Sequence, residues 1–451
     1  MKNIVLIGLP GSGKTTIGQQ VAKSSNMRYL DLDEWIEEQE GASIPDLFAS
    51  YGEPYFRMME TKAAQYASAQ TSAVISCGGG IVLKQENMHM LGAGGIIVFI
   101  DRDPAAIISD IDTQHRPLLK SGADKIWELY RERYDLYRTY ADYIIKNDSI
   151  AASLDDMESI LAIAKRSLEL AVIGDPISHS LSPEIHLAAL KRICGHASYE
   201  RIKIEKGKIG DHIDRLQRYY DGFNITMPHK ADIIPYLNDM DTDARIYHSV
   251  NTAVKTDRGF DGYNTDGIGF ASMVRDAGYA FEDKRITVMG AGGAAGTIAI
   301  KAAAEGAELV RILARKEEQA QRIANKIGEL YPNVQTECAD MSIDSRTAAC
   351  KTTDILINGT PLGMHGAEEF DTLDFMEALP KDALTCDLIY HPMKTMFYLK
   401  AEALGLKVLG GIGMLIDQAL IADELYIGHK LNMQSIQKRV IDTLIRKEII
   451  S

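Results

Sequence analysis

The chain has 451 residues, enough for two or three domains, and its 46% hydrophobic and 25% charged residues are typical of globular proteins. Its formal net charge of -14 argues against a nucleic acid or an acidic membrane as a partner, because both bind through basic patches, and favours small-molecule ligands. The cysteines are scattered without a C-x-x-C pair, as is typical of a reducing compartment: Cys77, Cys194, Cys338, Cys350 and Cys386. The first apolar run stops at Gly8 and lacks a signal-peptide pattern, so we expect a cytoplasmic protein.

Residues 1–168 alternate apolar runs with helical stretches, which predicts an α/β domain with a parallel sheet covered by helices. The expected strands include 4–7, 74–76 and 96–100. Ser153 and Asp156 have the spacing of a capping box, so we expect the closing helix of this domain to start there. A further strand is expected at 170–173, with no Gly/Ser-rich or Pro-rich linker before it, so the junction should be short.

The segment GLPGSGKT at residues 8–15 matches the phosphate loop G-x-x-x-x-G-K-[ST]. Its amides can surround ATP phosphates, Lys14 can reach the transferred phosphate, and Thr15 can offer its hydroxyl to Mg²⁺. An ordinary Gly-rich turn is the alternative, but the strand before the segment and the helical pattern after it favour a nucleotide site. The predicted nucleotide-binding residues are Gly11, Ser12, Gly13, Lys14, Thr15 and Thr16.

Other polar residues of this half have ordinary explanations when taken singly. Asp31 and Asp33 could form a solvated turn, Arg57 could pair with Glu60 one helical turn away, and Arg133 could lie on a charged helix face. Together, in the order LDLDEWIE, GEPYFR, SCGGG, HRPLL and RERYDLY, the motifs closely resemble the shikimate kinase family over nearly the whole half.

This resemblance implies a P-loop kinase that phosphorylates shikimate with ATP and Mg²⁺. Asp31 would hold the Mg²⁺ shell with Thr15, and is favoured by the resemblance over Asp101, which the pattern alone also suggests. Asp33 would accept hydrogen bonds from ring hydroxyls and act as the catalytic base or as an orienting group. The remaining implied roles are carboxylate binding by Arg57 and Arg133, close backbone approach to the ring at Gly79 and Gly80, and stabilisation of the transferred phosphoryl group by Arg116.

The second half divides into three predicted segments: an α/β segment at 169–278, a dinucleotide unit at 279–410, and helices at 411–451 that return toward the first segment. GAGGAAG follows a strand expected at 284–289 and matches the G-x-G-x-x-A turn of Rossmann folds. Arg315 and Lys316 end the next strand, where NAD sites usually place an acid, so NADP is predicted. The predicted cofactor residues are Gly290, Ala291, Gly292, Gly293, Ala294, Arg315 and Lys316.

Four motifs upstream of the dinucleotide unit are plausible loops after strands: SHSLSPEIH, NITMPHK, VNT and YNTDG. Three more motifs lie further along the chain: NGTPLGM, DLIY and GIGMLIDQ. Taken alone, Lys230 could be a surface lysine after a strand, and Asp266 could belong to a plain turn. Together the motifs resemble the shikimate dehydrogenase family over essentially all of 171–451.

This second resemblance implies a two-lobed enzyme, with an α/β substrate lobe and a Rossmann NADP lobe, that reduces 3-dehydroshikimate to shikimate with NADPH. Lys230 and Asp266 would form the catalytic pair, because a ketone reduced by hydride needs a proton for the new alkoxide. The other implied substrate residues are Ser180 and Ser182 for the carboxylate, Thr226, Asn251 and Gln418 for ring hydroxyls, and Tyr390 beside the pocket. The flanking histidines, read as packing or polar residues without a catalytic role, are His179, His186 and His229.

The leading hypothesis is a bifunctional enzyme in which the product of the carboxy-terminal half is the substrate of the amino-terminal half. Alternatives are a quinate/shikimate dehydrogenase fused to a degenerate or regulatory nucleotide-binding domain, a kinase for another small molecule, and a sensor that binds ATP and NADP without turnover. The presence together of Lys14, Asp33, Arg116, Lys230 and Asp266 argues against a sensor, which would not require these groups.

Overall fold

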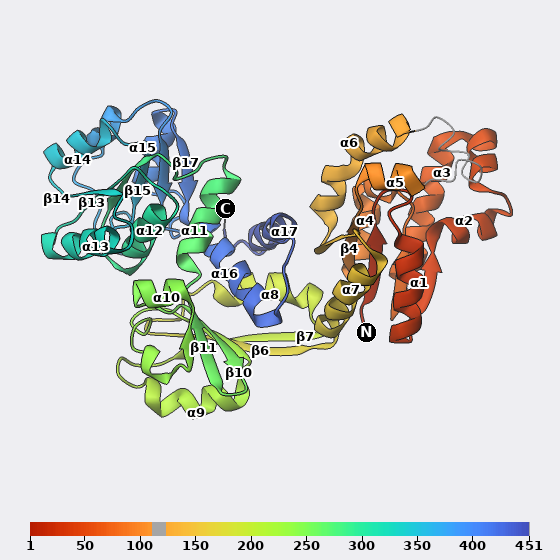
Figure 1. Cartoon of the computed structure of the whole chain (residues 1–451), viewed down its shortest axis with the longest axis horizontal. Helices are drawn as coiled ribbons and strands as arrows, with labels where there is room; N and C mark the ends of the chain where they lie inside the picture. The colour runs from red at the N-terminus through yellow and green to blue at the C-terminus, as the bar shows by residue number, and fades with distance from the viewer. Residues whose placement is uncertain (111–122, 451) are drawn as a thin grey trace. The chain divides into compact units, whose positions relative to one another are not determined.

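The computed structural model describes residues 1–110 and 123–450, and the described chain divides into two compact units (Figure 1). Unit 1 contains residues 1–168 together with 187–198 and 427–442. Unit 2 contains 169–186, 199–426 and the residues from 443 onward. Unit 1 thus includes two segments from the part of the sequence predicted to form the dehydrogenase. Among the described residues no helix is both long and apolar enough to cross a membrane.

Unit 1 is built on a parallel sheet with the strand order β2-β3-β1-β4-β5. Strands β1 and β3 are buried along their whole length because helices cover both faces of the sheet (Figure 1). The strands are β1 (Asn3–Ile7), β2 (Arg28–Asp31), β3 (Ala73–Ser76), β4 (Gly95–Asp101) and β5 (Tyr143–Lys146). The helices are α1 (Lys14–Ser25), α2 (Leu32–Glu40), α3 (Ile44–Ser68), α4 (Gln85–Gly94), α5 (Pro104–Asp110), α6 (Ala123–Tyr140) and α7 (Ile150–Lys165), with a 3-10 turn at Ile81–Leu83.

The expected start of the helix that closes this domain was wrong. Helix α7 begins at Ile150, and Ser149 is its N-cap, accepting a hydrogen bond from the Ala152 amide at 3.2 Å. Ser153 lies buried inside the helix and donates to Asn147 Oδ1 at 3.1 Å. The sequence offers two serines four residues apart, both of a residue type that suits an N-cap, and the structure uses the earlier one.

The first sheet of unit 2 has the order β7-β6-β8-β10-β11-β9 and mixes parallel with antiparallel pairs. Its strands are β6 (Ser167–Gly174), β7 (His196–Lys203), β8 (Gly222–Ile225), β9 (Asp239–Met240), β10 (Thr252–Thr256) and β11 (Gly259–Tyr263). The helices near it in sequence are α8 (Ser182–Ile193), α9 (Ile209–Tyr219), α10 (Thr242–Tyr247) and α11 (Asp266–Asp276), with a 3-10 turn at Ile234–Tyr236.

The second sheet of unit 2 is wholly parallel, with the order β14-β13-β12-β15-β16-β17. This is the strand order of a Rossmann dinucleotide-binding fold, as the sequence predicted. Its strands are β12 (Arg285–Met289), β13 (Leu309–Leu313), β14 (Gln335–Ala339), β15 (Ile355–Asn358), β16 (Leu384–Asp387) and β17 (Lys407–Gly410). Its helices are α12 (Gly293–Ala304), α13 (Glu317–Leu330), α14 (Ile343–Cys350) and α15 (Met396–Ala403), a 3-10 turn spans Asp374–Ala378, and α16 (Gly411–Ile427) and α17 (Met433–Arg446) follow.

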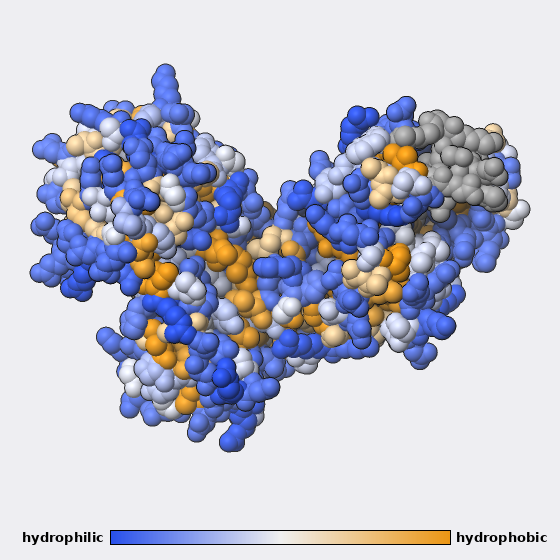
Figure 2. Space-filling view, viewed as in Figure 1, coloured by the Kyte–Doolittle hydropathy of each residue, from blue (hydrophilic) through white to orange (hydrophobic). Residues whose placement is uncertain are grey.

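Apolar side chains concentrate inside these layers. Separate buried clusters lie around the sheet of unit 1, around the mixed sheet, and on both sides of the Rossmann sheet. The face shown in Figure 2 is accordingly mostly hydrophilic, with apolar residues occupying smaller patches. Burial of this apolar area is the main favourable contribution to folding.

A buried ion cluster holds the two later segments within unit 1. Asp142 is fully buried, and its Oδ2 accepts hydrogen bonds from the Ile97 amide at 2.8 Å and from Arg192 Nε at 3.0 Å. Arg439 forms an ion pair with the other carboxylate oxygen, and the Asn432 amide donates to the Asp142 carbonyl at 3.0 Å. Burial opposes ionisation, but the two guanidinium groups and the amide outweigh it and lower the pKa of Asp142.

Replacement of Asp142 by Asn should destabilise unit 1 by about 3–5 kcal/mol, because it leaves two part-buried guanidinium groups without their carboxylate. Both tryptophans of the chain, Trp35 and Trp127, belong to unit 1, so the urea midpoint of tryptophan fluorescence reports on this unit. Asp148→Asn, an exposed aspartate in the same unit, serves as the control. An unchanged midpoint for Asp142→Asn would show that the cluster does not stabilise unit 1.

Candidate active sites

The phosphate loop connects β1 to α1 in unit 1. Gly11 and Gly13 have φ angles of 83° and 98°, in the left-handed region that glycine adopts without strain. Lys14 is buried, and its ammonium donates to the carbonyl oxygens of Gly8 at 2.9 Å and Leu9 at 2.8 Å. The other predicted nucleotide residues lie on the same loop and on the first turn of α1: Ser12, Thr15 and Thr16.

Asp31 ends β2 beside this loop. It is the N-cap of α2, accepting from the Asp33 amide at 3.0 Å, and it also accepts from the Tyr29 hydroxyl at 3.0 Å. The Thr15 hydroxyl donates to Asp31 Oδ2 at 3.4 Å. A hydroxyl and a carboxylate are the hard oxygen ligands that Mg²⁺ prefers. The structure therefore brings together the two residues predicted to hold the metal.

Asp33 differs from Asp31 in its environment. Burial, and next the charge of Asp31, raise the pKa of Asp33 to about 7, although Lys14 acts in the opposite direction. Gly78, which follows β3, packs directly against this carboxylate: a Cβ at Gly78 would lie 2.5 Å from Asp33 Oδ1. The absence of a side chain at Gly78 thus leaves room for Asp33.

Arg57 lies on α3, after the break at Gly52, where φ is 76° and the helix is interrupted. It pairs with Glu53 at 2.9 Å and with the buried Glu60 at 2.5 Å, so the pairing with Glu60 considered from the sequence does occur. Gly80 lies against the guanidinium, because a Cβ there would be 2.1 Å from Arg57 Nη1. Arg133, on α6, contributes positive charge at the same Glu60. Both predicted carboxylate-binding arginines are therefore close to one buried glutamate.

Gly79 packs between the phosphate loop and α6. The carbonyl oxygen of Gly79 accepts from the Tyr137 hydroxyl at 2.6 Å, and a Cβ at Gly79 would meet the Pro10 ring at 2.9 Å. The glycine triplet thus fits between the phosphate loop, Asp33 and Arg57. Arg116 lies outside the described residues.

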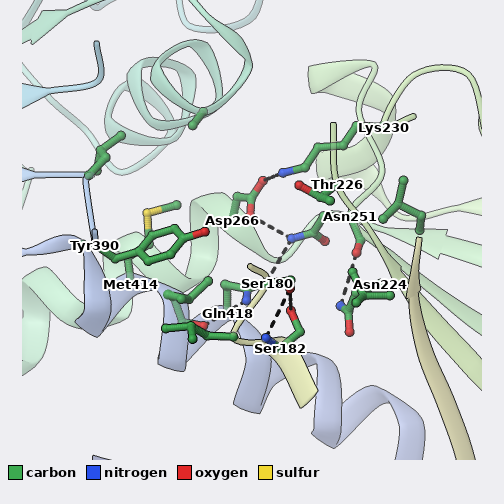
Figure 3. A pocket seen from close by; sticks show the side chains of 17 residues that line it. Ser180, Ser182, Asn224, Thr226, Lys230, Asn251, Asp266, Tyr390, Met414 and Gln418 are labelled. Atoms are coloured by element: carbon green, nitrogen blue, oxygen red, sulfur yellow. Dashed lines mark hydrogen bonds and ion pairs between the residues drawn. The ribbon is translucent and has the colours of Figure 1, made fainter. Parts of the chain in front are cut away.

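A cavity of about 210 Å³ in unit 2 contains all the substrate residues predicted for the second half (Figure 3). Its walls come from the mixed sheet, from the dinucleotide turn and from α16. The predicted residues among its lining are Ser180, Ser182, Thr226, Lys230, Asn251, Asp266, Tyr390 and Gln418, together with Ala294 of the cofactor turn.

Lys230 and Asp266 form an ion pair of 2.5 Å at one side of this cavity (Figure 3). Asp266 is the first residue of α11, where the helix dipole favours a carboxylate. Asn251 Nδ2 donates to Asp266 Oδ1 at 2.8 Å, to the Thr265 hydroxyl at 2.9 Å and to Gln418 Oε1 at 3.3 Å. The Asn251 side-chain amide therefore orients both Asp266 and Gln418 of α16.

Sequence reasoning missed Asn224 and Met414, which also line the cavity. Asn224 is buried, and its Oδ1 accepts from the hydroxyls of Tyr199 at 2.6 Å and Tyr426 at 3.1 Å. Its place in NITMPHK, two residues before Thr226, was a usable signal, since alternate residues of a strand share a face. Nothing in the sequence distinguishes Met414 from a core methionine.

The dinucleotide turn has the geometry that close approach of a cofactor requires. Gly290 has a φ of 106°, and a Cβ there would lie 2.7 Å from the Gly359 carbonyl oxygen. A Cβ at Gly292 or Gly293 would meet no atom within 4 Å, so these two glycines border open space. Ala291 and Ala294 complete the turn, and α12 begins at Gly293, so the turn leads into a helix amino terminus of the kind that can receive a pyrophosphate.

Arg315 and Lys316 follow β13, as predicted. The Arg315 side chain is 74% exposed and pairs loosely with Glu368 at 3.8 Å. Such an exposed pair contributes little and leaves the guanidinium accessible. Lys316 is the N-cap residue of α13.

Comparison with known proteins agrees with this geometry. The family model for shikimate kinase matches residues 10–165, and the model for the shikimate dehydrogenase substrate binding domain matches 172–253. The chain is 46% identical over 149 residues to a shikimate kinase of Clostridium beijerinckii, covering 33% of this chain and 88% of that protein. It is 35% identical over 268 residues to a shikimate dehydrogenase (NADP(+)) of Alkaliphilus oremlandii, covering 59% of this chain and 94% of that protein.

The chain belongs to the shikimate kinase and shikimate dehydrogenase families. A solved structure of a shikimate dehydrogenase from Thermus thermophilus in complex with NADP(H) and shikimate also resembles it, with 27% identity and a TM-score of 0.54. The match covers 61% of this chain and 100% of the other chain. The predicted families and α/β fold class are thus confirmed, and the protein is a shikimate-pathway enzyme with a kinase part and a dehydrogenase part.

Replacement of Gly78 by Ala should lower the kinase rate by about tenfold to a hundredfold, because a new Cβ displaces Asp33, and misplacement near 1 Å has effects of that size. The control is Gly94→Ala in α4, where the Cβ would meet only an ordinary contact at 3.5 Å. The dehydrogenase rate of each variant, measured on the same sample, reports the amount of intact protein. Full kinase activity of Gly78→Ala would contradict the assigned packing.

Proposed function

We propose that the dehydrogenase part reduces 3-dehydroshikimate to shikimate with NADPH, and that the kinase part transfers phosphate from ATP to shikimate with Mg²⁺. The observation that carries the proposal is the cavity of Figure 3, where the Lys230–Asp266 pair, hydroxyl and amide side chains and Ala294 of the cofactor turn face one space. This combination suits a polyhydroxylated acid that reacts beside a dinucleotide.

In the dehydrogenase site each side chain has a defined task. Ser180 and Ser182 hold the substrate carboxylate, and the ring hydroxyls lie against Thr226, Asn251 and Gln418. Lys230 donates a proton to the carbonyl oxygen as that oxygen becomes an alkoxide, and Asp266 keeps the ammonium oriented. Tyr390 lies beside the same space and closes its other side.

Bound NADPH would supply the hydride. The glycine turn fits a dinucleotide because its glycines border open space, and Ala294 brings the turn to the cavity. Arg315 and Lys316 would hold the additional phosphate that distinguishes NADP from NAD.

The kinase site depends on positioning and charge neutralisation. Lys14 and the loop amides would hold the ATP phosphates, and Thr15 with Asp31 would hold Mg²⁺, which would neutralise phosphate charge. Asp33 accepts the proton of the attacking hydroxyl, because its raised pKa suits a general base. Arg57 and Arg133 bind the shikimate carboxylate, and Arg116 stabilises the transferred phosphoryl group.

We also propose the functional division of the sequence into 1–168, 169–278, 279–410 and 411–451. A cytoplasmic location and the lack of nucleic-acid or membrane partners are proposed with it. The location is supported by the cysteines, all of which are free thiols, and the partners by the net charge of -14.

Lys14→Ala and Lys230→Ala should each abolish one activity. We expect Lys14→Ala to lower shikimate-dependent ADP formation by about a thousandfold while NADP⁺ reduction by shikimate continues, and Lys230→Ala to do the reverse, because each lysine acts on the developing charge of one reaction. Both assays are run on both variants. Loss of both activities from either change, or of neither, would refute the assignments, and oxidation of quinate alone would favour the quinate alternative.

The kinase rate should fall about tenfold per pH unit below pH 7, because Asp33 has its pKa raised to about 7 and is protonated, hence inactive as a base, at lower pH. The measurement is kcat/KM for shikimate between pH 5.5 and about 8.5 with Mg²⁺ in excess, within the range over which such a base titrates. A rate independent of pH from about 6 to 8 would contradict a base with this pKa and favour an orienting role for Asp33.

A further inference from the structure

A buried polar cluster lies behind the substrate cavity of unit 2 and contains none of the residues assigned above to catalysis. His186 on α8 and Asp423 on α16 are both fully buried, and His186 Nδ1 and Asp423 Oδ1 share a hydrogen bond of 2.6 Å. They lie 237 positions apart in the sequence. Burial raises the pKa of Asp423, although His186 opposes this.

The side chains of His186 and Asp423 form their hydrogen bond with each other. Neither His186 Nε2 nor Asp423 Oδ2 has a hydrogen-bond partner among the residues that the structure describes. A buried polar group without its partner is unfavourable, so removal of Asp423 leaves the imidazole with no polar contact that fixes its orientation. Well-packed apolar side chains often fill such a site at equal or lower cost, so we attribute the role of the pair to geometry rather than to stability.

Tyr199 connects the His186–Asp423 pair to the substrate cavity. The imidazole of His186 stacks on the Tyr199 ring, with centroids 4.7 Å apart and planes inclined by 13°. The buried Tyr199 hydroxyl donates to Asn224 Oδ1 at 2.6 Å and also interacts with the Ser182 hydroxyl. Asn224 and Ser182 both line the cavity, and Figure 3 shows them away from the Lys230–Asp266 pair.

The Asn224 side-chain amide is also held by a second tyrosine. Tyr426, three residues after Asp423 on α16, donates to Asn224 Oδ1 at 3.1 Å. Asn224 Nδ2 in turn donates to the Asn251 carbonyl at 3.2 Å and to the Thr252 hydroxyl at 3.1 Å. The position of Asn224 is thus set by groups behind the cavity, while its remaining surface faces the substrate.

We propose that Asp423 and His186 are positioning residues of the dehydrogenase: they fix the Tyr199 ring so that its hydroxyl holds Asn224 and Ser182 at the carboxylate end of the cavity. This inference rests on the proposed function, which places the substrate carboxylate at Ser180 and Ser182. Loss of the pair loosens that end of the cavity. It leaves Lys230, Asp266 and the cofactor turn in place, so binding of the acid weakens more than chemistry or cofactor binding.

The test compares steady-state oxidation of shikimate with NADP⁺ in Asp423→Ala, Asp423→Asn and Tyr199→Phe. We expect Asp423→Ala and Tyr199→Phe each to raise KM for shikimate about tenfold with little change in kcat or in KM for NADP⁺, because each removes one link in a buried chain. Asp423→Asn keeps an oxygen that can accept from Nδ1, so it should restore most of the lost affinity.

The double variant Asp423→Ala/Tyr199→Phe decides whether the two residues act together. If they belong to one chain of contacts, its KM should be no higher than that of the worse single variant. Tyr220→Phe is the matched control, since it removes a hydroxyl, bonded to Glu200, from another buried tyrosine of the same unit. The kinase rate of every variant is measured on the same sample to confirm that the chain is intact.

Several results would overturn the inference: an unchanged KM in Asp423→Ala, multiplied effects in the double variant, or an equal rise in KM for NADP⁺. If Asp423→Ala fails to fold, Tyr199→Phe decides the question, because it preserves the shape of the cluster and an unchanged KM for shikimate in that variant would overturn the inference. Failure of the wild-type chain to oxidise shikimate would instead refute the proposed function, together with the carboxylate end on which this inference rests.

Discussion

Parallel strands end along a single edge of their sheet, and this constraint places many of the groups assigned to chemistry. In unit 1 the phosphate loop follows β1, Asp31 ends β2, and the glycine triplet follows β3. In unit 2 Thr226 follows β8 and the cofactor turn follows β12. Because the strand edges bring these loops together, residues far apart in sequence need only short turns to share a site.

Two aspartates show how the surroundings separate roles within one chain. Asp266 has the Lys230 ammonium at 2.5 Å and the Asn251 amide at 2.8 Å, and it is the first residue of α11, so its contacts fix the position of the carboxylate and of the lysine. Asp33 is buried near a second carboxylate, which favours its protonated form. The first arrangement suits a group that orients a proton donor, and the second suits a group that takes a proton.

Motifs and the families that they resemble allowed the fold class, the Rossmann lobe and most of the cavity lining to be predicted. These features depend on local patterns: a strand, a glycine turn and a polar residue at a strand end. The predicted start of α7 was wrong because Ser149 and Ser153 offer similar local signals for an N-cap. The His186–Asp423 pair could not be predicted, since nothing local in the sequence indicates that residues 237 positions apart will meet. The roles of the individual site residues stay predictions.

Unit 1 is assembled from segments that are far apart in the sequence and are therefore synthesised at different times. Asp142 leaves the ribosome well before Arg192 and long before Arg439, so for most of synthesis its carboxylate is without one or both of its guanidinium partners. Domains usually fold as they emerge, amino-terminal first. In this chain the complete Asp142 cluster can form only after Arg439 has been synthesised, and a fragment cut after residue 168 would lack both arginines.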